Sequence, residues 1–301
     1  MSGFRRWAVV EFDVKLARAD MAGRVTTAVV NGDAVISLEP LFGSGELGRS
    51  LDAIVRAGEE TLADIAAFAT NARPDAALSQ VRLLAPLTAP RKIVAIGSNY
   101  PRPGAAPMAS DAPPVLFFKP PTALCGPYDP ILLPPEADLV IGEVELAVVI
   151  GRDGDRIPAN DAMAHVFGLM VANDVTAPKI LLGQSAENPL LLQQSRGKGF
   201  RTFCPTGPWI ETLDDRAMPR MTLEQRVDDF LEIRGETSQM LVELPTLLAD
   251  ISAAFGLEAG DVVLTGSPPP LAGNRTPLSP GVTLYSSIEG LGELANPVQQ
   301  L

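Results

Sequence analysis

The chain has 301 residues, of which 46% are hydrophobic and 20% charged, a composition typical of a globular protein with a sizeable core. Its formal net charge of −12 provides no basic surface for nucleic acid and disfavours binding to anionic membranes. One histidine and two cysteines are too few for a zinc finger, a two-histidine zinc protease motif or a disulfide scaffold.

The cellular location follows from the same counts. The two cysteines, Cys125 and Cys204, are isolated thiols of the kind found in a reducing compartment. No apolar run approaches the ~18–20 residues that span a bilayer. Acidic residues interrupt the apolar stretch near the first residue, so a signal peptide is not expected. We therefore expect a cytoplasmic protein that binds neither membranes nor nucleic acid.

Residues 1–85 are predicted to form a small N-terminal α+β domain. Short strands are expected over residues 4–38, with a hairpin over Thr26–Val35 around an Asn-Gly pair. A helix is predicted over residues 50–72, because Ser50 can cap it and apolar residues recur behind it at helical spacing. A short strand, Val81–Leu84, closes this unit.

Residues 86–301 are predicted to form a second, β-rich domain. Of the 28 prolines, 13 lie between Pro86 and Pro135, which favours a linker and an extended loop holding two short buried strands. The strands expected in and after this loop are Lys92–Gly97, Val115–Lys119, Leu139–Gly151, Phe167–Asn173, Asp261–Gly266 and Val282–Ile288. A helix is expected over Pro245–Phe255, with Gly256 ending it.

Three carboxylates are the first candidates for a chemical site. Glu143 and Glu145 stand two apart beside a buried strand, so both side chains project from the same face, about 7 Å apart. Two anions in a dry setting require neutralisation, and Asp174 at the end of the next strand could supply a third oxygen ligand. Such a set suits Mg²⁺, Mn²⁺ or Ca²⁺ and not Zn²⁺. Spacing alone leaves open that both glutamates face water.

Two lysines are further candidates. Lys198 lies between two glycines, which would let its side chain enter a site, although a solvated loop lysine fits the same pattern. Lys119 ends an apolar run, where its amine needs a partner or must extend to solvent.

Two other features carry weaker signals. The glycines at 43, 45 and 48 match the spacing of a dinucleotide-binding loop, but no acidic residue ends the next predicted strand and the preceding strand resembles half of a hairpin. His165 has no serine or cysteine in an elbow motif nearby, so we expect it to be structural or exposed.

Together, a series of motifs resembles the fumarylacetoacetate hydrolase family over residues 88–298. The motifs are, in order, Lys92–Tyr100, Phe117–Ala123, Gly142–Gly151, Val171–Thr176, Gly197–Phe200, Pro205–Ile210, Gly260–Gly266 and Ile288–Leu294. Residues 1–85 resemble the small N-terminal domain of longer bacterial members.

The resemblance implies a C-terminal β-roll of mixed sheets, an α+β fold overall and a homodimer. It implies that Glu143, Glu145 and Asp174 bind Mg²⁺ or Mn²⁺, with Lys198 beside the metal. Family members act on 2-oxo acids or 1,3-dicarbonyl compounds, and the cation holds two substrate oxygens and stabilises an enolate. Thr265 and Lys119, within matching motifs, are candidates for substrate binding.

The chain departs from the family where hydrolytic members keep a histidine and a glutamate that activate water. Pro103 and Ala106 stand at those two positions. Tyr100 and Asp111 are the nearest substitutes that the sequence offers. Three cations at other rewritten positions, Arg102, Lys179 and Arg201, could bind a carboxylate or lie on the surface.

These observations lead to a metal-dependent enzyme that cleaves a C–C bond of a 2-oxo acid or 1,3-dicarbonyl substrate by a hydrolase-like or decarboxylase-like route. Lys198 would orient the substrate or transfer a proton, and Tyr100 is the second catalytic candidate. Tautomerase or cyclase chemistry at the same site is the alternative, because it needs no base for water. An inactive relative with a binding role, and an oxidoreductase based on the glycine motif, remain as further hypotheses.

Overall fold

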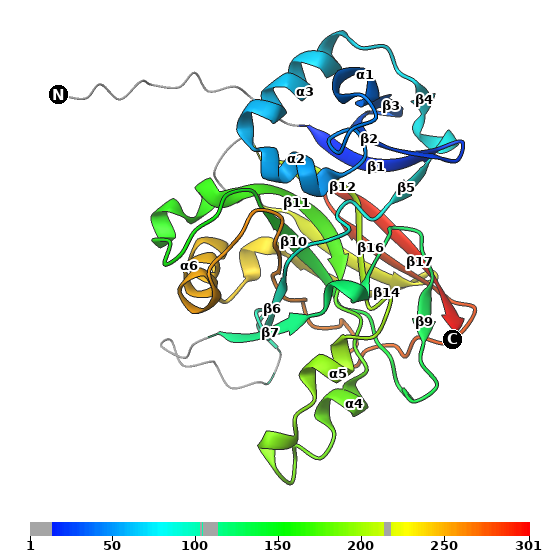
Figure 1. Ribbon diagram of the computed structural model, residues 1–301. Helices are drawn as coiled ribbons and strands as arrows, with labels where there is room; N and C mark the ends of the chain where they lie inside the picture. The colour runs from blue at the N-terminus through cyan, green and yellow to red at the C-terminus, as the bar shows by residue number, and fades with distance from the viewer. Residues whose placement is uncertain (1–13, 103, 105–113, 214–217) are drawn as a thin grey trace, which may run out of the picture.

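A computed structural model describes residues 14–102, 104, 114–213 and 218–301 of the chain (Figure 1). The positions of the expected water-activating pair, Pro103 and Ala106, and of Asp111 lie outside these residues. The α+β class with mixed sheets is confirmed, because two sheets contain both parallel and antiparallel pairs and helices cover them.

The first segment is an antiparallel meander covered by helices. Its strands are β1 (Lys15–Met21), β2 (Arg24–Asn31), β3 (Ala34–Ser37), β4 (Ala76–Ala77) and β5 (Arg82–Leu84), and its helices are α1 (Glu39–Phe42), α2 (Leu51–Ala57), α3 (Glu59–Asn71) and the 3₁₀ helix η1 (Leu78–Gln80). The predicted hairpin is confirmed as β2–β3. The prediction of a single helix over residues 50–72 is wrong in one respect. Gly58, at φ +81°, divides it into α2 and α3.

The proline-rich stretch holds more strands than a linker would. It contains β6 (Ile93–Gly97), β7 (Val115–Lys119), β8 (Leu124–Cys125) and β9 (Ile131–Leu133), with the 3₁₀ helix η2 (Pro121–Ala123) between them. The two predicted strands are confirmed as β6 and β7, which pair with each other. β9 joins the second sheet, so this stretch contributes to both sheets.

The large sheet takes strands from the first segment and from later parts of the chain. Its order is β4-β3-β2-β1-β12-β11-β10-β15-β6-β7, with β5 beside β1 and β8 beside β12. Its remaining members are β10 (Val144–Ile150), β11 (Val166–Asn173), β12 (Cys204–Thr212) and β15 (Val262–Leu264). β1 pairs with β12, so hydrogen bonds continue from the first 85 residues into the rest of the sheet.

The second sheet has the order β14-β13-β16-β17-β9. Its other strands are β13 (Thr222–Val227), β14 (Phe230–Glu236), β16 (Thr283–Ile288) and β17 (Gly292–Gln300). The helices of this part are α4 (Pro178–Leu182), α5 (Gln194–Lys198), α6 (Leu244–Phe255) and the 3₁₀ helices η3 (Ala159–His165), η4 (Pro189–Leu191) and η5 (Thr237–Gln239). α6 ends at Gly256 as predicted. α4 and α5 form an arm that extends from the body (Figure 1).

Alternate residues of β10 and β11 face two different cores. Ala147, Val149, Met170 and Ala172 pack with α2 and α3, whereas Val144, Leu146, Leu169 and Val171 pack with α6 and the second sheet. Both strands are therefore buried on both faces, which fits their nearly continuous apolar sequences. Within the described residues, no helix has the length and hydropathy needed to cross a bilayer.

A buried ion pair joins the starts of β6 and β15. Asp261 is fully buried and its Oδ2 lies 2.5 Å from Lys92 Nζ, while the backbone N–H of Glu258 donates to the same oxygen over 2.7 Å. We expect Asp261→Asn to lower the free energy of unfolding by about 2–4 kcal/mol, because Lys92 loses its closest partner and keeps only the 3.7 Å contact with Glu258. Urea denaturation measures the change.

Arg56→Ala is the matched control. The pair that Arg56 forms with Glu46 is exposed, so the expected change is below about 1 kcal/mol. Equal changes in the two variants would contradict a structural role for the buried pair.

Candidate metal centre

The strand register brings the three candidate carboxylates together. Glu143 immediately precedes β10 and stands opposite Asp174, whose backbone N–H donates to its carbonyl over 2.8 Å. Glu145 shares the parity of Ala147 and Val149, and Asp174 shares that of Met170 and Ala172. All three acids therefore belong to the sheet face that packs against α2 and α3 further along the strands.

The side chains converge as the alternation predicts. One carboxylate oxygen from each of Glu143, Glu145 and Asp174 lies within 4.8 Å of the other two. Asp174 and Glu145 are 0% and 2% exposed, and Glu143 is partly buried. The interpretation in which both glutamates face water is therefore wrong, because the neighbouring segments cover them.

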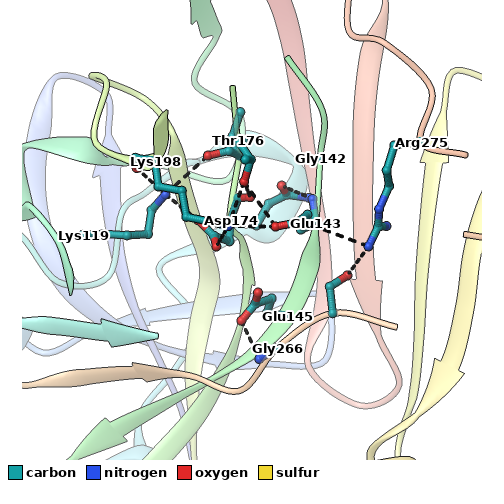
Figure 2. A network of polar contacts seen from close by, with 12 residues as sticks. Lys119, Gly142, Glu143, Glu145, Asp174, Thr176, Lys198, Gly266 and Arg275 are labelled. Carbon is teal, nitrogen blue, oxygen red and sulfur yellow. Dashed lines mark hydrogen bonds and ion pairs between the residues drawn. The ribbon is translucent and has the colours of Figure 1, made fainter. Parts of the chain in front are cut away.

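Two lysines approach this cluster from one side (Figure 2). Lys198, the last residue of α5, donates from Nζ to Glu143 Oε2 over 2.9 Å, to Thr176 Oγ1 over 2.9 Å and to Asp174 Oδ2. Lys119, the last residue of β7, donates to Asp174 Oδ1 over 2.6 Å and to the carbonyl of Lys198 over 2.5 Å. Lys198 is thus a buried site residue and not a solvated loop lysine.

The two fully buried acids differ in pKa, because the lysines contact Asp174 and not Glu145. Burial acts to raise the pKa of Asp174, but Lys119 and Lys198 outweigh it and hold that pKa below its usual value. Burial also opposes the charge on Lys198, yet Asp174 and Glu143 raise the pKa of that ammonium. Glu145 differs, because burial and the charge of Asp174 raise its pKa well above the usual value.

The donor set fits a divalent cation. None of the ion pairs among the described residues involves Glu145, whose Oε2 accepts the backbone N–H of Gly266 over 2.7 Å. A cation beside Glu145, Glu143 and Asp174 would offset the repulsion that raises the pKa of Glu145. Three carboxylates without an imidazole suit Mg²⁺ or Mn²⁺.

A buried amide holds the backbone of this site. Asn173 Oδ1 accepts the backbone N–H of Glu143 over 2.9 Å, and its Nδ2 donates to Gln225 and Ser286 in the second sheet. Gln225 in turn donates to the carbonyl of Gly142 over 3.1 Å. The second sheet therefore fixes the peptide that joins Gly142 and Glu143, directly through Gln225 and indirectly through Asn173.

Tyr100 and Thr265, two predicted site residues, lie near the carboxylates and differ in their hydrogen bonding. Tyr100 is 2% exposed and its hydroxyl has no hydrogen-bond partner among the described residues. Burial and the charge of Glu145 raise the pKa of Tyr100, so the phenol stays protonated and cannot serve as a base near neutral pH. Thr265 is fully buried, and its hydroxyl already donates to the carbonyl of Leu146 over 3.0 Å.

The three predicted cations differ in position. The charge of Arg102 acts on Arg275, a residue beside the carboxylates, although Arg102 itself is exposed. Lys179 is exposed and pairs with Asp138 over 3.7 Å. Arg201 is exposed, and no described contact joins it to the carboxylates. None of the three therefore has a described hydrogen bond or ion pair with the carboxylates of the site.

Sequence reasoning missed Arg275. It lies between β15 and β16 in a loop without periodicity, and one guanidinium nitrogen lies 3.8 Å from Glu143 Oε1. Burial lowers its pKa, while Glu143 and Glu232 act in the opposite direction. No motif marks this position, so only the folded chain shows it.

The two weaker features do not form a site. The glycines at 43, 45 and 48 follow the short helix α1, and the strand before that helix, β3, pairs antiparallel with β2 and β4. A dinucleotide-binding loop instead follows a strand of a parallel unit directly. His165 is at the opposite end of β11 from Asp174, about 30 Å away along the strand. Its Nδ1 lies 3.0 Å from the carbonyl of Arg152.

Comparisons with known proteins agree with this site. The profile described as fumarylacetoacetate (FAA) hydrolase C-terminal matches residues 92–299. A Bos taurus protein, the mitochondrial oxaloacetate tautomerase FAHD2B, is 38% identical over 275 residues, which are 89% of this chain and 85% of that protein.

Two solved structures extend the similarity to the whole fold. A probable 2-hydroxyhepta-2,4-diene-1,7-dioate isomerase from Mycobacterium abscessus has a TM-score of 0.78 and 30% identity, covering 96% of this chain and 99% of that one. Maleylpyruvate hydrolase from Sphingobium sp. SYK-6, in complex with manganese(II) and pyruvate, has a TM-score of 0.77 and 28% identity, covering 95% and 99%. The first 85 residues therefore have counterparts in these structures as well.

The raised pKa of Glu145 leads to a prediction about stability. The folded protein holds a proton on Glu145 more tightly than the unfolded chain does, so without metal this residue lowers stability as the pH rises above the usual glutamate value. We expect Glu145→Gln, measured with a chelator, to melt roughly 2–6 °C higher than wild type at pH 8, with a smaller difference at pH 5.

Mn²⁺ should then raise the melting temperature of the wild type and not that of Glu145→Gln. Glu136→Gln, which changes an exposed glutamate, should behave as wild type in both conditions. The same Mn²⁺ response in wild type and Glu145→Gln would exclude Glu145 as a ligand.

Proposed function

The chain belongs to the fumarylacetoacetate hydrolase family, and we propose that it is a Mg²⁺- or Mn²⁺-dependent enzyme that interconverts the keto and enol forms of a short 2-oxo acid such as oxaloacetate. The sequence analysis placed C–C bond cleavage first and tautomerisation second. The buried centre and the relatives named oxaloacetate tautomerase support the second reaction.

One observation carries the choice between these reactions. The sequence has a single histidine, and His165 lies at the far end of β11 from the carboxylates. Hydrolysis of a C–C bond needs a base that activates water, and the family's histidine is replaced by Pro103. Tautomerisation requires only that a proton moves between carbon and oxygen while the negative charge is stabilised.

Glu143, Glu145 and Asp174 would hold the cation, which supplies Lewis-acid stabilisation of negative charge on the substrate oxygens. Lys198 Nζ donates to Glu143, Asp174 and Thr176, and the two carboxylates raise its pKa. A cation bound by these carboxylates would compete for their oxygens and offset their charge, which would free N–H groups of Lys198 to deliver a proton. In the enol-to-keto direction, we propose that Lys198 protonates substrate carbon 3 while the enol hydroxyl releases its proton to solvent, and a proton from solvent then restores the Lys198 ammonium. Water exclusion by the surrounding core strengthens these charge interactions.

Lys119 and Tyr100 would support this step in different ways. The Nζ of Lys119 donates to Asp174, to the carbonyl of Lys198 and, over 3.4 Å, to the carbonyl of Val175. All three of its N–H groups are therefore used within the protein, so we propose that Lys119 positions Asp174 and Lys198 and does not bind substrate. The neutral Tyr100 hydroxyl would donate a hydrogen bond to a substrate oxygen.

C–C bond hydrolysis is the second candidate. The similarity to maleylpyruvate hydrolase of Sphingobium, a protein bound to manganese and pyruvate, favours it. A water-activating group would then have to come from a residue other than histidine.

The homodimer and the cytoplasmic location remain predictions. Light scattering of the purified protein tests the first, because a homodimer has twice the 31.8 kDa mass of the chain. Fractionation of the source cell tests the second.

The tautomerase activity can be followed by the ultraviolet absorbance of the oxaloacetate enol. We expect Mg²⁺ to be required and Lys198→Met to lower kcat by about 10²–10⁴-fold, because the proton donor is lost. Lys15→Gln, which changes a half-exposed lysine on β1, should stay within about twofold of wild type.

Wild-type enzyme that leaves the spontaneous rate unchanged in Mg²⁺ would refute the tautomerase. Release of oxalate or pyruvate from a 1,3-dicarbonyl acid would instead support the hydrolase.

A further inference from the structure

The guanidinium of Arg275 is held beside the carboxylates by its own hydrogen bonds, and a hydrogen bond of the next residue anchors its backbone. Its Nη2 donates to the carbonyl of Pro268 over 2.9 Å and to Ser267 Oγ over 3.4 Å. The next residue, Thr276, donates its backbone N–H to the buried carboxylate of Glu232 on β14. The side chain of Arg275 is 12% exposed, so it is a packed group and not a mobile surface arginine.

One nitrogen of this guanidinium is unused. Arg275 Nη1 is buried and has no hydrogen-bond partner among the described residues. A buried donor without an acceptor is unfavourable, because it has lost water and gained nothing in exchange. Glu143 does not satisfy it, since the 3.8 Å contact comes from Nη2 and is too long for a hydrogen bond.

Charges of both signs act on Arg275. The carboxylates of Glu143, Glu232 and Glu145 stabilise its positive charge, and the positive charge of Arg102 acts in the opposite direction. Arg275 and the two lysines approach the carboxylates from opposite sides (Figure 2). A substrate held at the carboxylates would therefore meet Lys198 on one side and Arg275 on the other.

We propose that Arg275 binds the distal carboxylate of a dicarboxylic 2-oxo acid and makes the enzyme selective for short diacids over 2-oxo monoacids. This inference rests on the proposed function, because it uses the same centre for the 2-oxo acid end of the substrate. The unused Nη1 supplies a charge-assisted hydrogen bond, and Arg102 adds a second positive charge. The loop from Ser267 to Thr276 thus acts as a specificity element.

The rival explanation is that Arg275 only neutralises Glu143. In that case its loss would weaken every ligand of the centre alike. If it binds the distal carboxylate, its loss would weaken diacids alone. A comparison of two ligands that differ by this carboxylate separates the two roles.

The test measures equilibrium binding of oxaloacetate and of pyruvate to the Mg²⁺-loaded full-length protein by calorimetry. We expect wild type to bind oxaloacetate at least tenfold more tightly than pyruvate. Arg275→Gln should weaken oxaloacetate binding at least tenfold and leave pyruvate binding within about twofold, a coupling between the side chain and the carboxylate. Arg275→Lys keeps the charge, so its affinity for oxaloacetate should lie between those of wild type and Arg275→Gln.

Arg234→Gln is the matched control, because it removes an exposed guanidinium that pairs with Glu224 on the second sheet. The proposal is overturned if wild type shows no preference for oxaloacetate, or if Arg275→Gln weakens both ligands equally or neither. Should Arg275→Gln fail to fold, the wild-type preference and its decrease in Arg275→Lys decide the question.

The two proposals can fail separately. If Arg275→Gln selectively loses oxaloacetate binding but wild type catalyses no tautomerisation, the proposed reaction is refuted and the role of Arg275 is retained. Tautomerisation by wild type with unchanged oxaloacetate binding in Arg275→Gln would do the reverse.

Discussion

Three carboxylates that share one buried space impose the constraint on which the rest of the structure depends. Asp174 and Glu145 have almost no contact with solvent, and an oxygen of each lies within 4.8 Å of one from Glu143. Such repulsion lowers stability unless positive charge or protonation offsets it. Two buried lysines balance part of it, and Glu145 remains without a lysine contact among the described ion pairs. A divalent cation is the natural counterpart of that remaining charge.

Much of the surrounding structure can be understood from this need. β7 and α5 end at Lys119 and Lys198, so two separate segments deliver ammonium groups to the same acids. Asn173 and Gln225 link the backbone around Glu143 to the second sheet. The second sheet and the lysine-bearing elements thus hold rigid a set of acids that would otherwise separate, and rigid placement is what charge stabilisation in catalysis requires.

The three acids and Lys198 could be predicted because strand alternation and the order of the motifs can be read directly from the sequence. It also predicted β6, β7, the β2–β3 hairpin and α6. It did not predict the break at Gly58, since helical periodicity continues on both sides of that residue. Nor did it indicate that the proline-rich stretch supplies strands to both sheets, because those pairings are long-range. Arg275 was not predicted for the same reason, since only tertiary contacts place its loop beside Glu143.

The central claim is that Glu143, Glu145 and Asp174 bind a divalent cation with Lys198 beside it. The most direct measurement is a crystal structure of the protein with Mn²⁺ and oxalate, with anomalous diffraction used to locate manganese. We expect one strong anomalous peak coordinated by oxygens of all three residues, with oxalate bound to it and Lys198 Nζ within hydrogen-bond reach of the oxalate. Manganese located elsewhere, or the three carboxylates still held by lysines alone at saturating Mn²⁺, would contradict it.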